Sequence, residues 1–177
     1  MTALRKPILT GKRVILRPIT IADAPAMHAS LSDAESMRLT GTHETYSLDD
    51  VTDHCRLVEL ADNRVDYAIV VDGETIGETV LNDWHRANRS ASFRIAIWYR
   101  RHRDRGYGSE ATRLLIRFGF EQLGLNRIEL EVFAFNPRAR HVYEKAGFVH
   151  EGTRRQALWW DGRPIDAHVM AIVRGAV

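Results

Sequence analysis

Two glycines in a basic turn, directly before a long amphipathic helix pattern, constrain this chain more than any other feature. The turn runs from Arg103 to Gly108, and a helical pattern begins at Ser109. Glycine lets backbone N–H groups approach a ligand closely, and a helix N-terminus attracts anions. Arginines crowd the approach at positions 100, 101, 103 and 105. Because like charges so close together repel one another, the pattern predicts a site for a phosphate-bearing ligand.

Composition and charge exclude several classes of protein. The 177 residues, 45% apolar and 27% charged, predict one globular domain over residues 1–177. The formal net charge of +2 gives no reason to expect a nucleic-acid partner. The single cysteine, Cys55, excludes an internal disulfide and a cysteine-rich metal site, and we expect a buried, inert thiol. The chain has no signal-peptide pattern and no apolar run near the ~18 residues of a membrane span, so we expect a cytoplasmic protein with no membrane partner.

The order of predicted elements indicates an α+β fold with one central mixed, mostly antiparallel sheet. Alternation of apolar and polar residues, with turn signals such as Asp72-Gly73, predicts about seven strands. They cover residues 12–18, 66–71, 74–82, 92–98, 128–135, 148–160 and 165–173. About four helices are expected, over residues 20–31 and 47–60, from Ser109 to a C-cap at Gly124, and over 136–145. The polar segment 33–47 is expected to be an irregular loop.

The glycine turn has two other interpretations. A purely structural turn accounts for the glycines but leaves the cluster of arginines unexplained. A dinucleotide-binding fold fits the pattern Gly106-x-Gly108-x-x-Ala111, with Glu129 downstream as the ribose-binding acid. Its context argues against it, because a polar, arginine-rich segment and a three-strand meander precede the glycines, where a buried strand is required.

The third interpretation is an acyl-coenzyme A site, and here the chain resembles a known family. Arg103-x-x-Gly106-x-Gly108 is similar to the Q/R-x-x-G-x-G/A motif of the GNAT acetyltransferase superfamily. The segment from Asn136 to Phe148 resembles the later N-x-x-(S/A)-x-x-x-Y-x-K-x-G-F motif, with Ala139 where many members have serine. Residues 14–23 and 159–162 look like the RimJ/RimL branch, which is also similar to bacterial spermidine acetyltransferases.

The resemblance implies the GNAT fold, with a splay between the fourth and fifth predicted strands and acetyl-CoA as cosubstrate. The pantetheine arm would lie in the splay like an added strand and pair with the backbone near residues 97–99. The expected cofactor-binding residues are Ile97, Trp98, Tyr99, Arg103, Asp104, Arg105, Gly106, Tyr107, Gly108, Ser109, Asn136, Arg138 and Tyr143. Of these, Asn136 is also expected to cap the short helix that follows it.

Acetyl transfer to an amine needs a base for the ammonium proton and a proton donor for the departing thiolate. By motif position, Tyr143 is the expected donor. By resemblance, Glu131 is the expected base, although a carboxylate on a sheet is equally often a solvent-facing or ion-paired group. Glu78, Asp83 and His85 are the fallback candidates for the base. The spacing of the histidines matches no metal motif, and no metal is expected.

The resemblance predicts an N-acetyltransferase that acts on a primary amine, either a small molecule or a protein N-terminus, by direct attack in a ternary complex. The acidic stretch 33–53 would suit a cationic acceptor, and Trp159 and Trp160 would line the acceptor cleft or an interface. A polyamine- or antibiotic-type enzyme and a non-catalytic acetyl-CoA sensor are the alternatives. A nucleic-acid-binding module is a third, disfavoured because the positive charge is local. A homodimer is left open.

Overall fold

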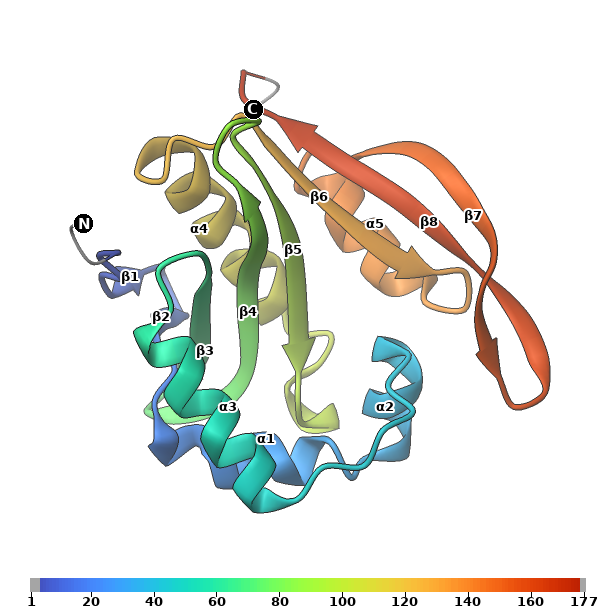
Figure 1. Ribbon diagram of the computed structural model, residues 1–177, viewed down its shortest axis with the longest axis horizontal. Coiled ribbons are helices and arrows are strands. Elements are labelled where there is room, and N and C mark those ends of the chain that lie inside the picture. Colours follow the sequence, from blue (N-terminus) through green and yellow to red (C-terminus); the bar gives the residue numbers. More distant parts are fainter. Residues whose placement is uncertain (1–3, 176–177) are drawn as a thin grey trace.

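Eight strands form one mixed sheet in the computed structural model, which describes residues 4–175 (Figure 1). The strand order is β1-β2-β3-β4-β5-β6-β8-β7. The strands are β1 Leu9–Thr10, β2 Ile15–Pro18, β3 Val65–Val71, β4 Glu74–His85, β5 Ser90–Ile97, β6 Arg127–Phe133, β7 Val149–Trp160 and β8 Arg163–Val173. The helices are α1 Ala24–Ser30, α2 Ala34–Thr40, α3 Leu48–Leu60, α4 Tyr107–Glu121 and α5 Pro137–Lys145, with 3-10 turns at Ile21–Asp23 and Arg100–His102.

The predicted α+β class and the mostly antiparallel sheet are confirmed, with two elements more than expected. The strand β1 was missed because two residues are too few to show a periodicity. The expectation of an irregular segment over 33–47 was wrong, because α2 lies inside it. Both of its boundary signals are visible in the sequence: Asp33 accepts a hydrogen bond from the Ser36 N–H at 2.8 Å, and Gly41 ends the helix at φ 67°.

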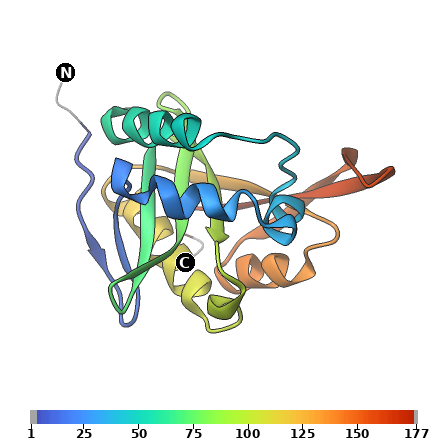
Figure 2. The same cartoon turned by 90° about the horizontal axis from the view of Figure 1, so that it is seen from below.

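Helices cover both faces of the sheet. Figure 2 shows α4 and α5 on one side and α1 and α3 on the other. Tyr67 and Phe118 pack edge to face in the larger core beneath α4, and Trp98 lies with Cys55 in the smaller core beneath α3. Burial raises the pKa of the Cys55 thiol to about 11, as expected for an inert cysteine. Of the described helices, none is long and apolar enough to cross a membrane.

The strands β5 and β6 pair only at one end, and this divergence creates the site. They run parallel through three residue pairs, from Ser90↔Arg127 to Ser92↔Glu129, and then separate (Figure 1). The predicted splay is therefore confirmed, and the meander β3-β4-β5 on one side of it is antiparallel as predicted. On the other side, β6 stays paired with β8 along its whole length. Each of the two strands that border the gap is thus hydrogen-bonded to another strand on its other side.

Candidate functional site

A cavity of about 530 Å³ opens where β5 and β6 separate, and it reaches both faces of the sheet. Phe93 and Tyr143 line it on the face covered by α4 and α5. Glu78, Arg94 and Phe133 line it on the opposite face, beside α2. This size is typical of pockets that hold small-molecule ligands. A molecule that lies in the gap therefore contacts different chemical groups at its two ends.

The N-terminus of α4 faces the cavity with its backbone donors uncapped. Gly106 takes φ 82° and ψ 0° at the N-cap position, and no side chain caps the helix. Glu110, in the first turn, instead accepts hydrogen bonds from the backbone N–H groups of Arg13 at 2.8 Å and Val14 at 3.2 Å. Gly106, Tyr107, Gly108 and Ser109 all line the cavity. A phosphate fits this arrangement, because unbonded N–H groups at a helix N-terminus bind anions.

Gly108 leaves open the space in front of these donors. A methyl group added there would meet Ile97 at 3.7 Å and Ile95 at 3.9 Å, which are ordinary van der Waals distances. The fold therefore does not require glycine at this position for packing. Its φ also lies outside the left-handed region, so no backbone strain demands glycine either. Access of a ligand to the helix N-terminus remains as the physical reason for a glycine here.

Repulsion among the arginines before α4 was a partly wrong reason to predict a phosphate site, because the fold itself supplies carboxylate partners for some of them. Arg101 forms an ion pair with Glu74, and Arg103 forms one with Glu35 at 2.7 Å. Arg105 does not line the cavity; its carbonyl accepts a hydrogen bond from Arg13 at 2.9 Å. Two of the four arginines, Arg101 and Arg103, are thus used to hold the surrounding segments in place.

Arg103 joins α2 to the edge of β5. Its side chain is only 7% exposed, and its Nε donates to the Ile97 carbonyl at 3.2 Å. Its terminal nitrogens donate to Glu35 at 2.7 Å and to the Ser36 hydroxyl at 2.9 Å. Sequence reasoning expected this arginine to contact the cofactor directly. The geometry gives it a positioning role, since three groups of the chain already bind its guanidinium.

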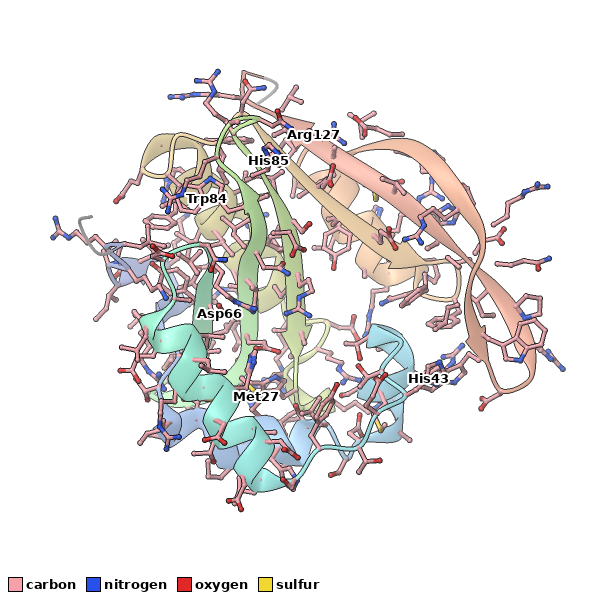
Figure 3. All side chains as sticks on the ribbon, in the orientation of Figure 1. Met27, His43, Asp66, Trp84, His85 and Arg127 are labelled. Atoms are coloured by element: carbon pink, nitrogen blue, oxygen red, sulfur yellow. The ribbon has the colours of Figure 1, made fainter. Side chains whose placement is uncertain are left out.

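Residues 34–43, which include α2 and are called the α2 segment below, also reach the far side of the gap. Gly41 lies against β6 so closely that an added methyl group would meet the Phe133 ring at 2.6 Å. His43 stacks on Trp160 of β7 with ring centroids 4.7 Å apart (Figure 3). Trp160 therefore contacts this segment and lies outside the cavity lining, and Trp159 is 62% exposed. The α2 segment thus spans the wide end of the splay from β5 to β6.

The backbone at the end of β5 only partly matches the prediction. The Trp98 N–H donates to the Ile76 carbonyl of β4 at 2.9 Å, and its side chain is buried, so Trp98 has no free donor for a ligand. Tyr99 also lies outside the cavity lining. Because N–H directions alternate along a strand, the N–H of Ile97 points the other way, toward the gap. Ile97 is the one residue of this predicted trio that lines the cavity.

The Asn136 motif brings its residues to the cavity. The Asn136 side chain accepts a hydrogen bond from the Ala139 N–H at 3.1 Å and caps α5 as predicted. Tyr143 is 8% exposed and packs edge to face against Phe93, and burial raises the pKa of its phenol well above the usual value. Its hydroxyl therefore keeps its proton at physiological pH. Both Asn136 and Tyr143 line the cavity.

Arg138 and Asp104, both predicted to bind the cofactor, form an ion pair with each other at 2.8 Å. The pair links the turn before α4 to α5, and both residues line the cavity. Both side chains are substantially exposed, so the pair contributes little to stability. Its charges are accordingly available to rearrange around an anion.

The candidate bases differ sharply in environment. Glu78 of β4 lines the cavity, and burial raises its pKa to about 7, opposed by the nearby positive charge of Arg94. Glu131 of β6 also lines the cavity, but it is exposed and forms an ion pair with Arg154. Asp83 and His85 lie outside the lining, toward the narrow end of the splay. A carboxylate with a pKa near neutrality matches the requirement for a general base, so the geometry favours Glu78.

The described residues contain no group of three or more histidine, cysteine, aspartate or glutamate side chains able to hold a metal ion. The cavity lining offers carboxylates, arginines, histidines, phenols and backbone donors. These groups suit proton transfer and anion binding.

Comparisons with known proteins agree with this geometry. Residues 13–149 match the family model described as acetyltransferase (GNAT) domain. The chain is 32% identical to the L-amino acid N-acetyltransferase AaaT of Escherichia coli (strain K12), over 83% of this chain and 96% of that protein. It is 27% identical to the spermidine N(1)-acetyltransferase of Vibrio cholerae, over 93% of this chain and 95% of that protein. A crystal structure of spermidine N-acetyltransferase from Vibrio cholerae in complex with CoA and spermine shares the fold, with a TM-score of 0.88 at 24% identity, covering 94% of this chain and 98% of that one.

The role of Arg103 as the anchor of α2 can be tested by hydrogen exchange. Arg103→Ala removes three hydrogen bonds of a charged group, each worth about 1.5–3 kcal/mol, so the amides of α2 should exchange at least about tenfold faster. Arg100→Ala, an exposed arginine in the same turn, is the matched control. Equal exchange of α2 in the two variants would show that Arg103 does not anchor the helix.

Proposed function

Since the chain belongs to the GNAT family and is an acetyl-CoA-dependent N-acetyltransferase, we propose that its acceptor is a small primary amine that binds in the cavity between β5 and β6. The observation that carries the proposal is that one cavity reaches both faces of the sheet. An anion-binding helix N-terminus lies at one end, and a carboxylate with a pKa of about 7 lies at the other. The α2 segment spans the wide end of the gap, which favours a small acceptor over a folded protein partner.

On the cofactor side, the proposal assigns the phosphates of acetyl-CoA to the N–H groups at the start of α4. Asp104, in the turn before this helix, and Arg138 and Asn136, at the start of α5, also line the cavity and are proposed to contact the cofactor as well. The gap-facing N–H of Ile97 is available to pair with an extended ligand lying along β5. A bound thioester supplies the acetyl group, and the chain's own residues orient it and manage the protons.

On the acceptor side, Glu78 removes the proton that an ammonium carries at neutral pH, because only the free amine has a lone pair for attack. The free amine attacks the thioester carbonyl in a single ternary complex, forming the N–C bond and breaking the C–S bond with no acetylated enzyme. The nitrogen loses its second proton as the amide forms, and the departing thiolate takes up one proton to become the thiol. Burial keeps the Tyr143 hydroxyl protonated, so it is suited to donate a hydrogen bond that stabilises the departing sulfur. Glu131 remains the second candidate for the base, since it lines the same cavity.

The cofactor assignment predicts the effect of filling the space at Gly108. Gly108→Val places a branched side chain in front of the α4 donors, and the dissociation constant for coenzyme A, measured by titration calorimetry, should rise at least about tenfold. Gly108→Ala should keep a melting temperature close to that of the parent, because an added methyl group meets its neighbours at ordinary van der Waals distances, and it should also weaken binding, though less than valine does. Gly152→Val, at an open position outside the cavity, is the control. Unchanged affinity in Gly108→Val would remove this turn from the binding site.

The base assignment predicts a pH dependence, measured by thiol release from acetyl-CoA with a panel of primary amines. Glu78 accepts a proton only when ionised, so kcat/KM should rise with pH through about 7 and then level off. Glu78→Gln should lower kcat by about 10²-fold or more and abolish this rise. Its effect on coenzyme A affinity should be small. A parent protein that releases no thiol with any primary amine would overturn the proposed function.

Two further measurements separate Glu78 from Glu131. A carboxyl whose pKa is raised by folding stabilises the folded state at low pH, and this contribution is lost as pH rises from about 4.5 toward 7. Glu78→Gln should therefore flatten the pH dependence of unfolding over that window. Glu131→Gln should change both the pH profile and the turnover much less. A larger loss of turnover in Glu131→Gln than in Glu78→Gln would make Glu131 the base.

A further inference from the structure

We propose that Arg94 binds a carboxylate of the acceptor, so that the preferred substrates are free α-amino acids rather than polyamines. The inference deepens the proposed function, because it names the acceptor class for the same cavity, and it rests on that function. Arg94 is then a specificity-determining residue, and Glu78 and Arg94 together recognise the two charges of a zwitterion.

The register of the sheet places Arg94 and Glu78 together on the acceptor face. On the antiparallel pair β4–β5, Arg94 lies opposite Val80, and Glu78 lies opposite Ala96. Directly opposed residues share a face, and so do residues two apart on one strand. Arg94 and Glu78 are therefore diagonal neighbours, a relationship that separates Cα atoms by about 7–8 Å. Both line the cavity, and the positive charge of Arg94 acts on the pKa of Glu78.

These two charges differ from the other charged groups that line the cavity. Glu131 is paired with Arg154, Arg103 with Glu35, and Asp104 with Arg138. Within residues 4–175, neither Arg94 nor Glu78 forms an ion pair with any other side chain. Glu78 is partly buried, so a ligand of opposite charge relieves the cost of its desolvation, and Arg94 is exposed, so its charge is free to meet a ligand in the cavity. The acceptor end of the cavity thus offers one cation and one carboxylate to a ligand.

A free α-amino acid matches this pair. Its amine and its carboxylate are attached to one carbon, so the two groups lie within a few ångströms of each other and fit between diagonal neighbours on two strands. With the amine directed at Glu78, the carboxylate lies toward the guanidinium of Arg94, which suits bidentate pairing. The apolar side chains of Leu39, Val80 and Phe133 complete the lining and suit an apolar substrate side chain.

A polyamine fits the same cavity poorly. Its second ammonium would need a second carboxylate, but Glu131 is paired with Arg154, and Asp104 lies in the turn before α4, on the proposed cofactor side. It would also meet the positive charge of Arg94, and two like charges in a half-buried site repel each other strongly. The one available carboxylate, Glu78, is the proposed base for the reacting amine.

The experiment compares each amino acid with its own carboxamide, which keeps the amine and the side chain but removes the negative charge. The probes are L-alanine, L-leucine, L-threonine, their carboxamides and spermidine, assayed by thiol release from acetyl-CoA. The parent should prefer each acid over its amide by at least about tenfold in kcat/KM, and should prefer the acids over spermidine. Arg94→Gln should lower the acid-to-amide ratio of kcat/KM toward one, mainly through a higher KM for the acids; the ratio is measured well above pH 7, where Glu78 is ionised, because Arg94 also lowers the pKa of Glu78. Arg113→Gln, an exposed arginine on α4 outside the cavity, should behave as the parent does.

Binding measurements separate failure of this inference from failure of the proposed function. L-leucine added to the protein saturated with coenzyme A should raise the melting temperature of the parent and not that of Arg94→Gln. Turnover of spermidine or of the carboxamides in preference to the acids would overturn the role of Arg94 and leave the proposed function standing. An equal loss for acids and amides in Arg94→Gln would likewise assign Arg94 a structural role. Absence of any turnover together with absence of a leucine-induced shift would overturn both.

Discussion

The loss of pairing between β5 and β6 beyond Ser92 is the constraint on which the rest of this structure depends. Backbone N–H and C=O groups need partners, and a strand edge that faces a gap exposes a row of them. Part of this demand is met within the chain, where Arg103 donates to the Ile97 carbonyl. The remainder is available to an extended ligand. The proposed binding site is therefore a stretch of the sheet in which β5 and β6 have no strand between them.

The same divergence separates the two halves of the chemistry. A continuous sheet would isolate the α4 face from the α2 face, whereas the gap lets one cavity contact both. The uncapped N-terminus of α4 and Tyr143 belong to one face, and Glu78 and Arg94 belong to the other. Two reactants can approach from opposite sides and meet between the strands. This arrangement suits direct transfer between two bound molecules, since each has its own route and its own recognition groups.

Local signals in the sequence predicted the helices and strands well, but they did not show which distant residues pair with each other. The meander, the α4 turn and the Asn136 cap follow from residues within a few positions of one another, and each was predicted. The partner of Arg103 is Glu35, 68 positions away, so no local pattern could show that this arginine anchors α2. Asp33 and Gly41 did mark the boundaries of α2, but a seven-residue helix between polar segments shows too little periodicity to stand out.

The choice of base illustrates the same limit. Glu131 and Glu78 both sit on strands at alternating positions, and the motif favoured Glu131. Their environments differ only in the folded chain, where Arg154 of β7 reaches Glu131 across the intervening strand β8 and burial raises the pKa of Glu78. Desolvation and ion pairing depend on the tertiary surroundings, and a single sequence contains no direct record of them.

The three residue pairs between β5 and β6 also act as the pivot of a lever. In the described chain, β1 to β5 form one arm of the sheet and β6 to β8 the other, and strand pairing joins the arms only at these pairs. Arg127, at the first of these pairs, is bonded within its own arm to Glu129 at 3.0 Å and to Glu151 at 2.6 Å. The angle between the arms sets the width of the gap at its open end, which the α2 segment also spans through its contacts with Arg103 and Phe133. The width of the binding cavity therefore depends on residues that do not line it.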